Sequence, residues 1–228
     1  MAKKIYLSPS SQLTNKYATG NTNEQEQCRK ISDACAAYLI KAGFEVKNAK
    51  YGDMYSRVDE SNRWGADLHV PIHTNAFDGT ITGGTQIYLL TVKEDSKHEQ
   101  VGSAIFKELS PLTPGKSHEG LKPNESFYEI KKANALTVYM ECEFHDTYTG
   151  AKFIINNVKA IGEAIAKGIC KYYGVALPTE TPKKENNTSS SDGALYVVRA
   201  GAFKDKANAD KRVADLKKAG FDAYVKKE

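Results

Sequence analysis

The 228-residue chain is long enough for one well-buried domain and a small appendage. With 40% hydrophobic and 26% charged residues, its composition excludes a disordered or fibrous protein. The net charge of +4 at pH 7 does not demand a nucleic-acid partner, although it favours an anionic surface such as a cell wall. No run approaches the ~20 apolar residues of a membrane-spanning helix, so we expect no membrane insertion.

Residues 1–9 enter a predicted strand at once and lack the apolar stretch of a secretory signal. We therefore expect a protein that is made in the cytoplasm and reaches any target outside it after release by another agent. The four cysteines lack the Cys-x-x-Cys spacing of a metal site or the density of a disulfide framework. They are predicted to be reduced thiols, most of them packed.

After a first strand over residues 4–8, a helix is predicted over residues 24–43, where apolar side chains recur at spacings of three and four after the capping residue Asn23. Further helices are predicted over residues 57–64, 96–109 and 149–173, the last with a break near residues 156–157. Strands are predicted over residues 4–8, 44–46, 67–73, 84–91, 127–130 and 135–142. This alternation predicts an α/β domain with a mainly parallel sheet flanked by helices.

The composition changes after this domain, which we place at residues 1–175. Residues 176–193 are rich in Pro, Thr, Asn, Lys and Ser and are predicted to be a linker. Residues 194–228 have the order strand (195–199), helix (207–219) and strand (221–225). Because 35 residues are few for a solitary domain, this unit is expected to pair with the main domain, with a second copy in a homodimer, or with a ligand.

Three residues far apart in the sequence are candidates for one site. His73 ends a short apolar strand, and in open α/β sheets ligands collect beyond the carboxyl ends of the strands. Glu24 begins the first long helix, and Glu141 lies at the end of another apolar strand. A metal held by His and Glu beside a second Glu acting as base is the arrangement of a zinc hydrolase.

The neighbours of these residues are given other roles. Asn75 is well placed to touch a substrate, whereas His69 lies about 13 Å back along the strand and is expected to be packed in the core. Cys142 points to the face opposite Glu141 and is rejected as a nucleophile, and Glu143 is expected to be exposed. Burial would raise the pKa of Glu141 and suit it to act as a general base.

Four motifs in sequence resemble the type-3 N-acetylmuramoyl-L-alanine amidases, the zinc enzymes of autolysins and phage endolysins. They are Asn23-Glu24 with Ile31, the segment 66–76 around His73, Gly83-Gly84-Thr-Gln-Ile-Tyr-Leu, and Val138-Tyr-Met-Glu141-Cys-Glu-Phe144. The likeness covers residues 4–174. It implies a zinc enzyme with Glu24 and His73 as metal ligands and Glu141 as the catalytic base.

The chain departs from this family at one ligand, because the loop after its first strand carries no His where the family has one. The loop offers the Ser11 hydroxyl or the Gln12 amide oxygen instead, and His145 lies four residues past Glu141. Since zinc prefers imidazole to a neutral oxygen, we expect His145 rather than Gln12 or Ser11 to be the third ligand.

The C-terminal segment resembles half of a SPOR domain, a module associated with peptidoglycan. The likeness rests on Tyr196-Val-Val-Arg-Ala-Gly201-Ala-Phe203, Asn208-Ala and Leu216-Lys-Lys-Ala-Gly220-Phe. Nine Lys and Arg against five Asp and Glu in this segment would suit anionic wall polymers.

The leading hypothesis is therefore a zinc-dependent amidase of a phage or prophage endolysin, which cuts the lactyl–L-Ala amide of peptidoglycan. The main alternative is a peptidoglycan-binding protein on an amidase scaffold whose catalysis has decayed. A third is a zinc peptidase that acts within the stem peptide.

Overall fold

The computed structural model describes residues 2–178, 201–218 and 224–225. By its internal contacts the chain divides into two units, Met1–Thr179 and Glu180–Glu228. Within the described part of the second unit there is one helix, α6 (Lys206–Lys218), which begins one residue before the helix predicted over residues 207–219. The predicted strand 195–199, residues 221–223 of the second predicted strand, and all but the first three residues of the predicted linker lie outside the described residues.

The first unit is built on a seven-stranded sheet in the order β2-β1-β3-β7-β4-β5, with β6 beside β3. All pairs are parallel except β4 and β7, so the predicted mainly parallel α/β architecture is confirmed. The strands are β1 (Lys4–Pro9), β2 (Glu45–Asn48), β3 (Leu68–Asn75), β4 (Gln86–Leu89), β5 (Gly120–Pro123), β6 (Leu136–Thr137) and β7 (Tyr139–Phe144).

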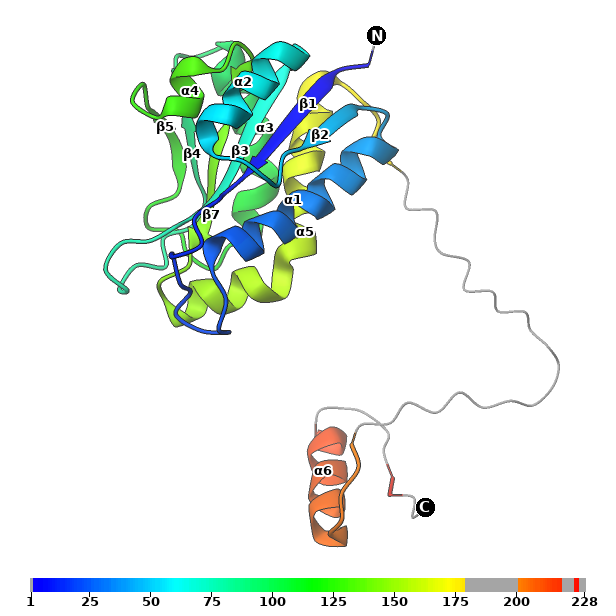
Figure 1. Ribbon diagram of the computed structural model, residues 1–228. Coiled ribbons are helices and arrows are strands. Elements are labelled where there is room, and N and C mark those ends of the chain that lie inside the picture. The colour runs from blue at the N-terminus through cyan, green and yellow to red at the C-terminus, as the bar shows by residue number, and fades with distance from the viewer. Residues whose placement is uncertain (1, 179–200, 219–223, 226–228) are drawn as a thin grey trace, which may run out of the picture. The chain divides into compact units, whose positions relative to one another are not determined.

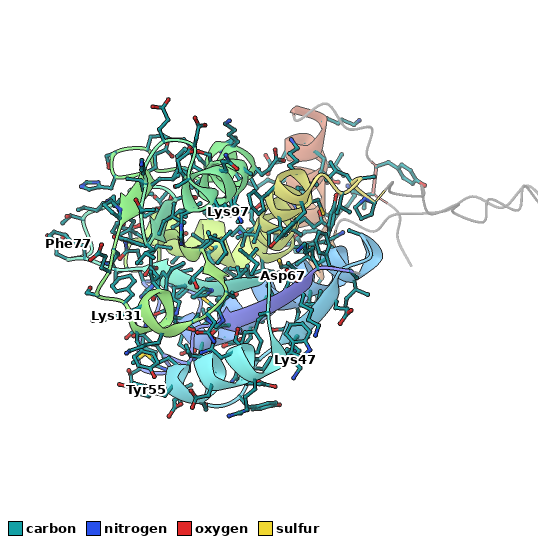
Figure 2. All side chains as sticks on the ribbon, turned by 90° about the horizontal axis from the view of Figure 1, so that it is seen from above. Lys47, Tyr55, Asp67, Phe77, Lys97 and Lys131 are labelled. Atoms are coloured by element: carbon teal, nitrogen blue, oxygen red, sulfur yellow. The ribbon has the colours of Figure 1, made fainter. Side chains whose placement is uncertain are left out.

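Helices cover both faces of this sheet. They are α1 (Glu24–Lys41), α2 (Met54–Trp64), α3 (Lys97–Leu109), the short 3-10 helix η1 (Ser110–Leu112), α4 (Tyr128–Lys132) and α5 (Tyr148–Tyr173). The helices α1 and α3 both contact α5, and α2 contacts α4 (Figure 1). Figure 2 shows α2, marked by Tyr55, and α4, marked by Lys131, on one side of the sheet and α3, marked by Lys97, on the other.

Two predicted features of the helices are confirmed and one predicted strand is wrong. The side chain of Asn23 caps α1 by accepting the N–H of Glu26 at 3.0 Å. The long helix α5 is kinked at Asn157, where the break was predicted. Of residues 127–130, predicted to be a strand, Phe127 is instead the N-cap of α4 and the other three are its first residues, while β5 lies earlier in the same segment. A short apolar run does not distinguish a strand from one turn of helix.

The two faces of the sheet differ in chemistry because side chains alternate along each strand. One face contributes the apolar side chains of the core that α1, α3 and α5 cover; these are Ile5, Leu7, Leu68, Val70, Ile72, Ile87, Leu89, Met140 and Cys142. The opposite face, which we call the polar face, carries Tyr6, Ser8, His69, His73, Gln86, Tyr88, Tyr139 and Glu141. The sheet therefore holds its reactive side chains on one side.

The helices α2 and α4 cover one part of the polar face. The hydroxyl of Tyr6 donates to Glu60 of α2 at 2.7 Å, and His69 contacts Ser61 of α2 at 3.0 Å and Glu129 of α4 at 3.2 Å. His73 lies four residues further along β3 than His69, toward the carboxyl end of the strand. This is the end at which a ligand site is expected in an open α/β sheet.

None of the helices among the described residues is both long and apolar enough to cross a membrane.

Candidate active site

Glu24 and His73 meet at the carboxyl end of β3. The Oε1 atom of Glu24 lies 2.8 Å from Nδ1 of His73, and only 1% of Glu24 and 9% of His73 are exposed. Burial raises the pKa of Glu24, but hydrogen bonds from His73 and Asn15 outweigh it and hold that pKa below its usual value. Burial lowers the pKa of His73, but its hydrogen bond with Glu24 and the nearby Glu141 carboxylate raise it overall. The two side chains therefore form a buried, charge-assisted pair.

Two amide side chains from the loop after β1 surround this pair. Asn15 donates from Nδ2 to Glu24 Oε2 at 2.7 Å and to Gln12 Oε1 at 2.8 Å. The Nε2 atom of Gln12 lies 3.5 Å from Nδ1 of His73. Asn15 was not among the predicted site residues, and its nine-residue separation from Glu24 carries no sequence signal. Ser11 is exposed, and its carbonyl oxygen accepts from Gln25 at 3.1 Å.

Glu141 lies beside this pair with a buried carboxylate oxygen that is unsatisfied among the described residues. In the sheet it is the neighbour of His73 on β3 and of Gln86 on β4. Its Oε2 atom is enclosed and has no hydrogen-bond partner among the described residues. Burial raises the pKa of Glu141 to about 8, with the negative charge of Glu24 adding to the rise and His73 opposing it. A carboxylate without a structural partner in such a place is a candidate for chemistry rather than stability.

An aromatic cluster adjoins His73. The ring of Tyr139 stacks on the His73 imidazole, with centroids 4.6 Å apart and planes 16° from parallel. Phe127 packs against Tyr139 at 4.7 Å, and Tyr88 approaches it edge-on at 6.4 Å. Sequence reasoning missed Tyr139, although its position two residues before Glu141 on one strand places both on the same face.

The structure does not bring His145 together with Glu24 and His73. Its Nδ1 atom lies 2.9 Å from both the carbonyl oxygen and the hydroxyl of Thr74, and its ring stacks on Tyr17 with centroids 4.8 Å apart. Burial lowers the pKa of His145 and so favours its neutral form. The expectation that His145 is the third ligand therefore has no geometric support, and the residue instead holds Tyr17 and its loop against the sheet.

Two neighbours of the site are tied into the protein. Asn75 donates from Nδ2 to Gln86 at 3.0 Å and accepts the N–H of Ala76 at 2.8 Å, so its substrate contact stays a prediction. Glu143, expected to be exposed, is fully buried, and that expectation is wrong. Its carboxylate accepts the backbone N–H groups of Gly84, Gly115 and Phe144 at 2.8–3.1 Å. Three buried backbone amides, two of them in loops, are satisfied by this carboxylate, which explains why it is drawn inside.

The remaining cysteine and histidine expectations agree with the structure. Cys28, Cys35, Cys142 and Cys170 are free and buried. His69 is fully buried, as predicted for a packed residue.

The donor set at Glu24 and His73 fits a divalent cation, with one weak ligand. No group of three His, Cys, Asp or Glu side chains that could hold a metal ion occurs in the described part of the chain. The third donor at this point is the amide of Gln12, whose oxygen and nitrogen are assigned from hydrogen bonding alone. One carboxylate, one imidazole and one amide oxygen suit zinc less well than a second imidazole would, while the unpartnered oxygen of Glu141 favours a positive charge nearby.

Comparison with solved structures defines the class of fold. The catalytic domain of CwlV, an N-acetylmuramoyl-L-alanine amidase from Bacillus (Paenibacillus) polymyxa var. colistinus, superposes with a TM-score of 0.68 at 16% identity. The match covers 76% of this chain and 99% of that domain.

The sequence profile of the N-acetylmuramoyl-L-alanine amidase family (Amidase_3) matches residues 6–171, and the chain belongs to this family. The SPOR domain profile matches residues 177–227. A sporulation-specific N-acetylmuramoyl-L-alanine amidase of Bacillus subtilis (strain 168) is 26% identical over 97% of this chain and 84% of its own length. An uncharacterized 38.4 kDa protein of Clostridium perfringens is 29% identical over 87% of this chain, which spans 60% of that relative.

Proposed function

We propose that this chain is a metal-dependent N-acetylmuramoyl-L-alanine amidase that hydrolyses the amide between the lactyl group of N-acetylmuramic acid and the L-alanine of peptidoglycan. The observation that carries the proposal is the meeting of Glu24 and His73 beside Glu141, whose Oε2 has no partner among the described residues. Membership of the amidase family and the matching SPOR profile support this substrate.

The residues that would hold the metal are Glu24, His73 and, through its amide oxygen, Gln12. When bound there, a zinc ion would polarise the substrate carbonyl and lower the pKa of the attacking water. Asn15 fixes the orientation of the Glu24 carboxylate, so it acts through this ligand. Tyr139 holds the plane of the His73 imidazole by stacking.

Glu141 is the proposed general base and acid. It takes a proton from water as the water oxygen bonds to the carbonyl carbon, and it returns this proton to the alanine nitrogen as the C–N bond breaks. Its place between His73 and Gln86 puts the carboxylate next to the proposed metal ligands. Asn75, hydrogen-bonded to Gln86, is the proposed contact to substrate.

The C-terminal unit is proposed to hold the enzyme on the wall. A second tethered contact raises the local concentration of the first unit on an insoluble substrate.

We extend the proposal to a lysis enzyme of a phage or prophage, made in the cytoplasm and active on the wall after release. Expression with and without a membrane-permeabilising pore protein tests this role, since lysis that does not need the pore contradicts it. The homodimer through this unit stays a prediction that sedimentation of the full chain tests.

One observation favours a second candidate, a peptidoglycan-binding protein without catalysis. The third donor is a neutral amide in an exposed residue, Gln12, so the metal would be held loosely. In this reading the Glu24–His73 pair is a hydrogen-bonded remnant, and the protein binds wall without cutting it.

Digestion of purified cell wall by metal-loaded and chelator-treated protein separates these functions. The amidase releases new L-alanine amino termini, loses this activity with chelator and regains it with zinc. Protein that sediments with wall but releases no amino termini supports the binding function and overturns the amidase. New amino termini other than L-alanine would point to a peptidase that acts within the stem peptide.

A further inference from the structure

The hydroxyl group of Tyr139 has no hydrogen-bond partner among the described residues. The other two tyrosines of the polar face are bound: the hydroxyls of Tyr6 and Tyr88 contact Glu60 and Gln86 at 2.7 and 2.8 Å. Tyr139 is also partly exposed, so its hydroxyl is not sealed inside the protein. A phenol that is fixed in place yet unpartnered is available to a ligand.

The ring that carries this hydroxyl is held on two sides. His73 stacks on it at 4.6 Å and Phe127 packs against it at 4.7 Å, which fixes the ring plane. Strand side chains stand roughly perpendicular to the sheet. Since a phenol is longer than an imidazole and the two rings are nearly parallel, the hydroxyl of Tyr139 extends past the ring of His73, away from the sheet.

The hydroxyl also lies on the same face as the proposed base. Tyr139 and Glu141 are two residues apart on β7, a separation of about 7 Å along a strand. A scissile amide placed beside Glu141 and His73 would have one side of its carbonyl group toward Tyr139. The hydroxyl is then a hydrogen-bond donor on the side of the reacting carbon where charge develops.

We propose that Tyr139 is a further catalytic residue, whose hydroxyl donates a hydrogen bond to the carbonyl oxygen of the scissile amide. This inference rests on the proposed amidase function. As the water oxygen bonds to the carbonyl carbon, the π electron pair of the C=O bond moves onto its oxygen. Tyr139 stabilises this oxygen without giving up its proton, and the pair returns to the carbonyl when the C–N bond breaks. A donor aimed at a developing oxyanion lowers the barrier more than it strengthens substrate binding.

Two substitutions separate the hydroxyl from the ring. Tyr139→Phe keeps the stack on His73 and is expected to lower kcat about 100-fold with KM nearly unchanged, the size typical of a lost oxyanion donor. Tyr139→Leu also removes the stack and should weaken zinc binding as well, measured by calorimetry. The matched control is Tyr88→Phe, which removes a hydroxyl in the same cluster that already binds Gln86, and its kcat should stay close to that of the wild type.

A binding measurement makes the test independent of turnover. The probe is a muramyl peptide in which a tetrahedral phosphonate replaces the scissile amide. Tyr139→Phe should bind this probe about 100-fold more weakly than the wild type, as expected for a lost oxyanion contact, and bind an uncleaved wall fragment equally well. If the wild type cleaves wall and Tyr139→Phe is as fast and binds the probe as tightly, the role of Tyr139 is overturned while the amidase function stands. Wild-type protein that neither cleaves wall nor binds the probe overturns the amidase function and this inference together.

Discussion

Two histidine–glutamate pairs lie on the same face of β3, four residues apart, and they differ in what surrounds them. His69 contacts Glu129 at 3.2 Å, and both are completed by the hydroxyls of Ser61 and Ser8. His73 contacts Glu24 at 2.8 Å beside the unpartnered oxygen of Glu141. Only the second pair lies at the carboxyl end of the strand.

The comparison teaches that the residue types alone do not make a site. In the pair His69–Glu129, which we call the inner pair, Ser8 of β1 and Ser61 of α2 supply the remaining hydrogen-bond partners, and a satisfied polar group in the protein interior only stabilises it. In the pair His73–Glu24, which we call the outer pair, the loop after β1 supplies amides. The neighbouring Oε2 atom of Glu141 is left without a hydrogen-bond partner among the described residues. A site is therefore recognised by what is unsatisfied at a strand end rather than by a His next to a Glu.

The substitution with the largest expected effect on the site at the outer pair is Glu141→Gln. It keeps the shape of the side chain and removes the base, so we expect the release of L-alanine amino termini from wall to fall about 1,000-fold. Thermal unfolding should change little, because Glu141 Oε2 makes no hydrogen bond to the described residues that the change could remove. The control is Glu129→Gln in the inner pair, which should lower stability and leave kcat near the wild-type value. Equal rates for wild type and Glu141→Gln would remove Glu141 from the chemistry.

Alanine at each histidine gives the next largest effect. His69→Ala leaves the buried Glu129 carboxylate without its imidazole partner, with only the neutral Ser8 hydroxyl still donating to it, and should lower the free energy of unfolding by about 3 kcal/mol. His73→Ala should cost about 1 kcal/mol, because Glu24 keeps its hydrogen bond from Asn15, but it should abolish zinc binding. Urea unfolding and zinc calorimetry on both variants measure the two effects. A larger stability loss for His73→Ala than for His69→Ala would reverse the roles assigned to the pairs.

The sequence predicts the outer pair because its members follow recognisable signals. Glu24 comes directly after a helix cap, and His73 ends an apolar run in a strand. Glu141 places a carboxylate at the end of another apolar run, where it has no structural reason to be. These signals depend on the local spacing of apolar and capping residues, which can be read directly from the sequence. The mainly parallel sheet was predictable for the same reason.

The surroundings of the site were not predictable, because they depend on which loops pack on the polar face. The buried role of Glu143 follows from the backbone amides of two distant loop residues, Gly84 and Gly115, together with that of its neighbour Phe144. The helix α4 replaces a predicted strand where the Asn124 side chain accepts the N–H groups of Ser126 and Phe127 and turns the chain. The contacts of Glu143 with Gly84 and Gly115 join residues with no common spacing in the sequence, whereas the turn at Asn124 is local but competes with a short apolar run that also fits a strand.

The substitution Gln12→His gives the proposed metal site at the outer pair a second histidine and so widens its difference from the inner pair. A second imidazole in the place of the neutral amide should raise zinc affinity about 10-fold or more, since zinc prefers imidazole to an amide oxygen. The measurement is calorimetric titration of metal-free protein. Gln12→Ala is the control and should bind zinc no more tightly than the wild type. Unchanged affinity in Gln12→His would show that the loop does not direct position 12 toward the metal.

The smallest effect concerns the dependence of stability on pH in the inner pair. Burial raises the pKa of Glu129, but the hydrogen bond and charge of His69 outweigh it and hold that pKa below its usual value. Because a depressed carboxyl pKa means that the folded protein binds the proton less tightly, the stabilisation is complete above the ordinary Glu pKa of about 4.3 and is lost as the pH falls below it. His73 on β3, Ser8 on β1 and Arg57 on α2 also influence the Glu129 carboxylate.

Urea unfolding from neutral pH to about pH 3 should therefore show a steeper loss of stability for the wild type than for Glu129→Gln. Parallel curves would mean that the inner pair contributes no acid-sensitive stability, and the contrast with the outer pair would then rest on position alone.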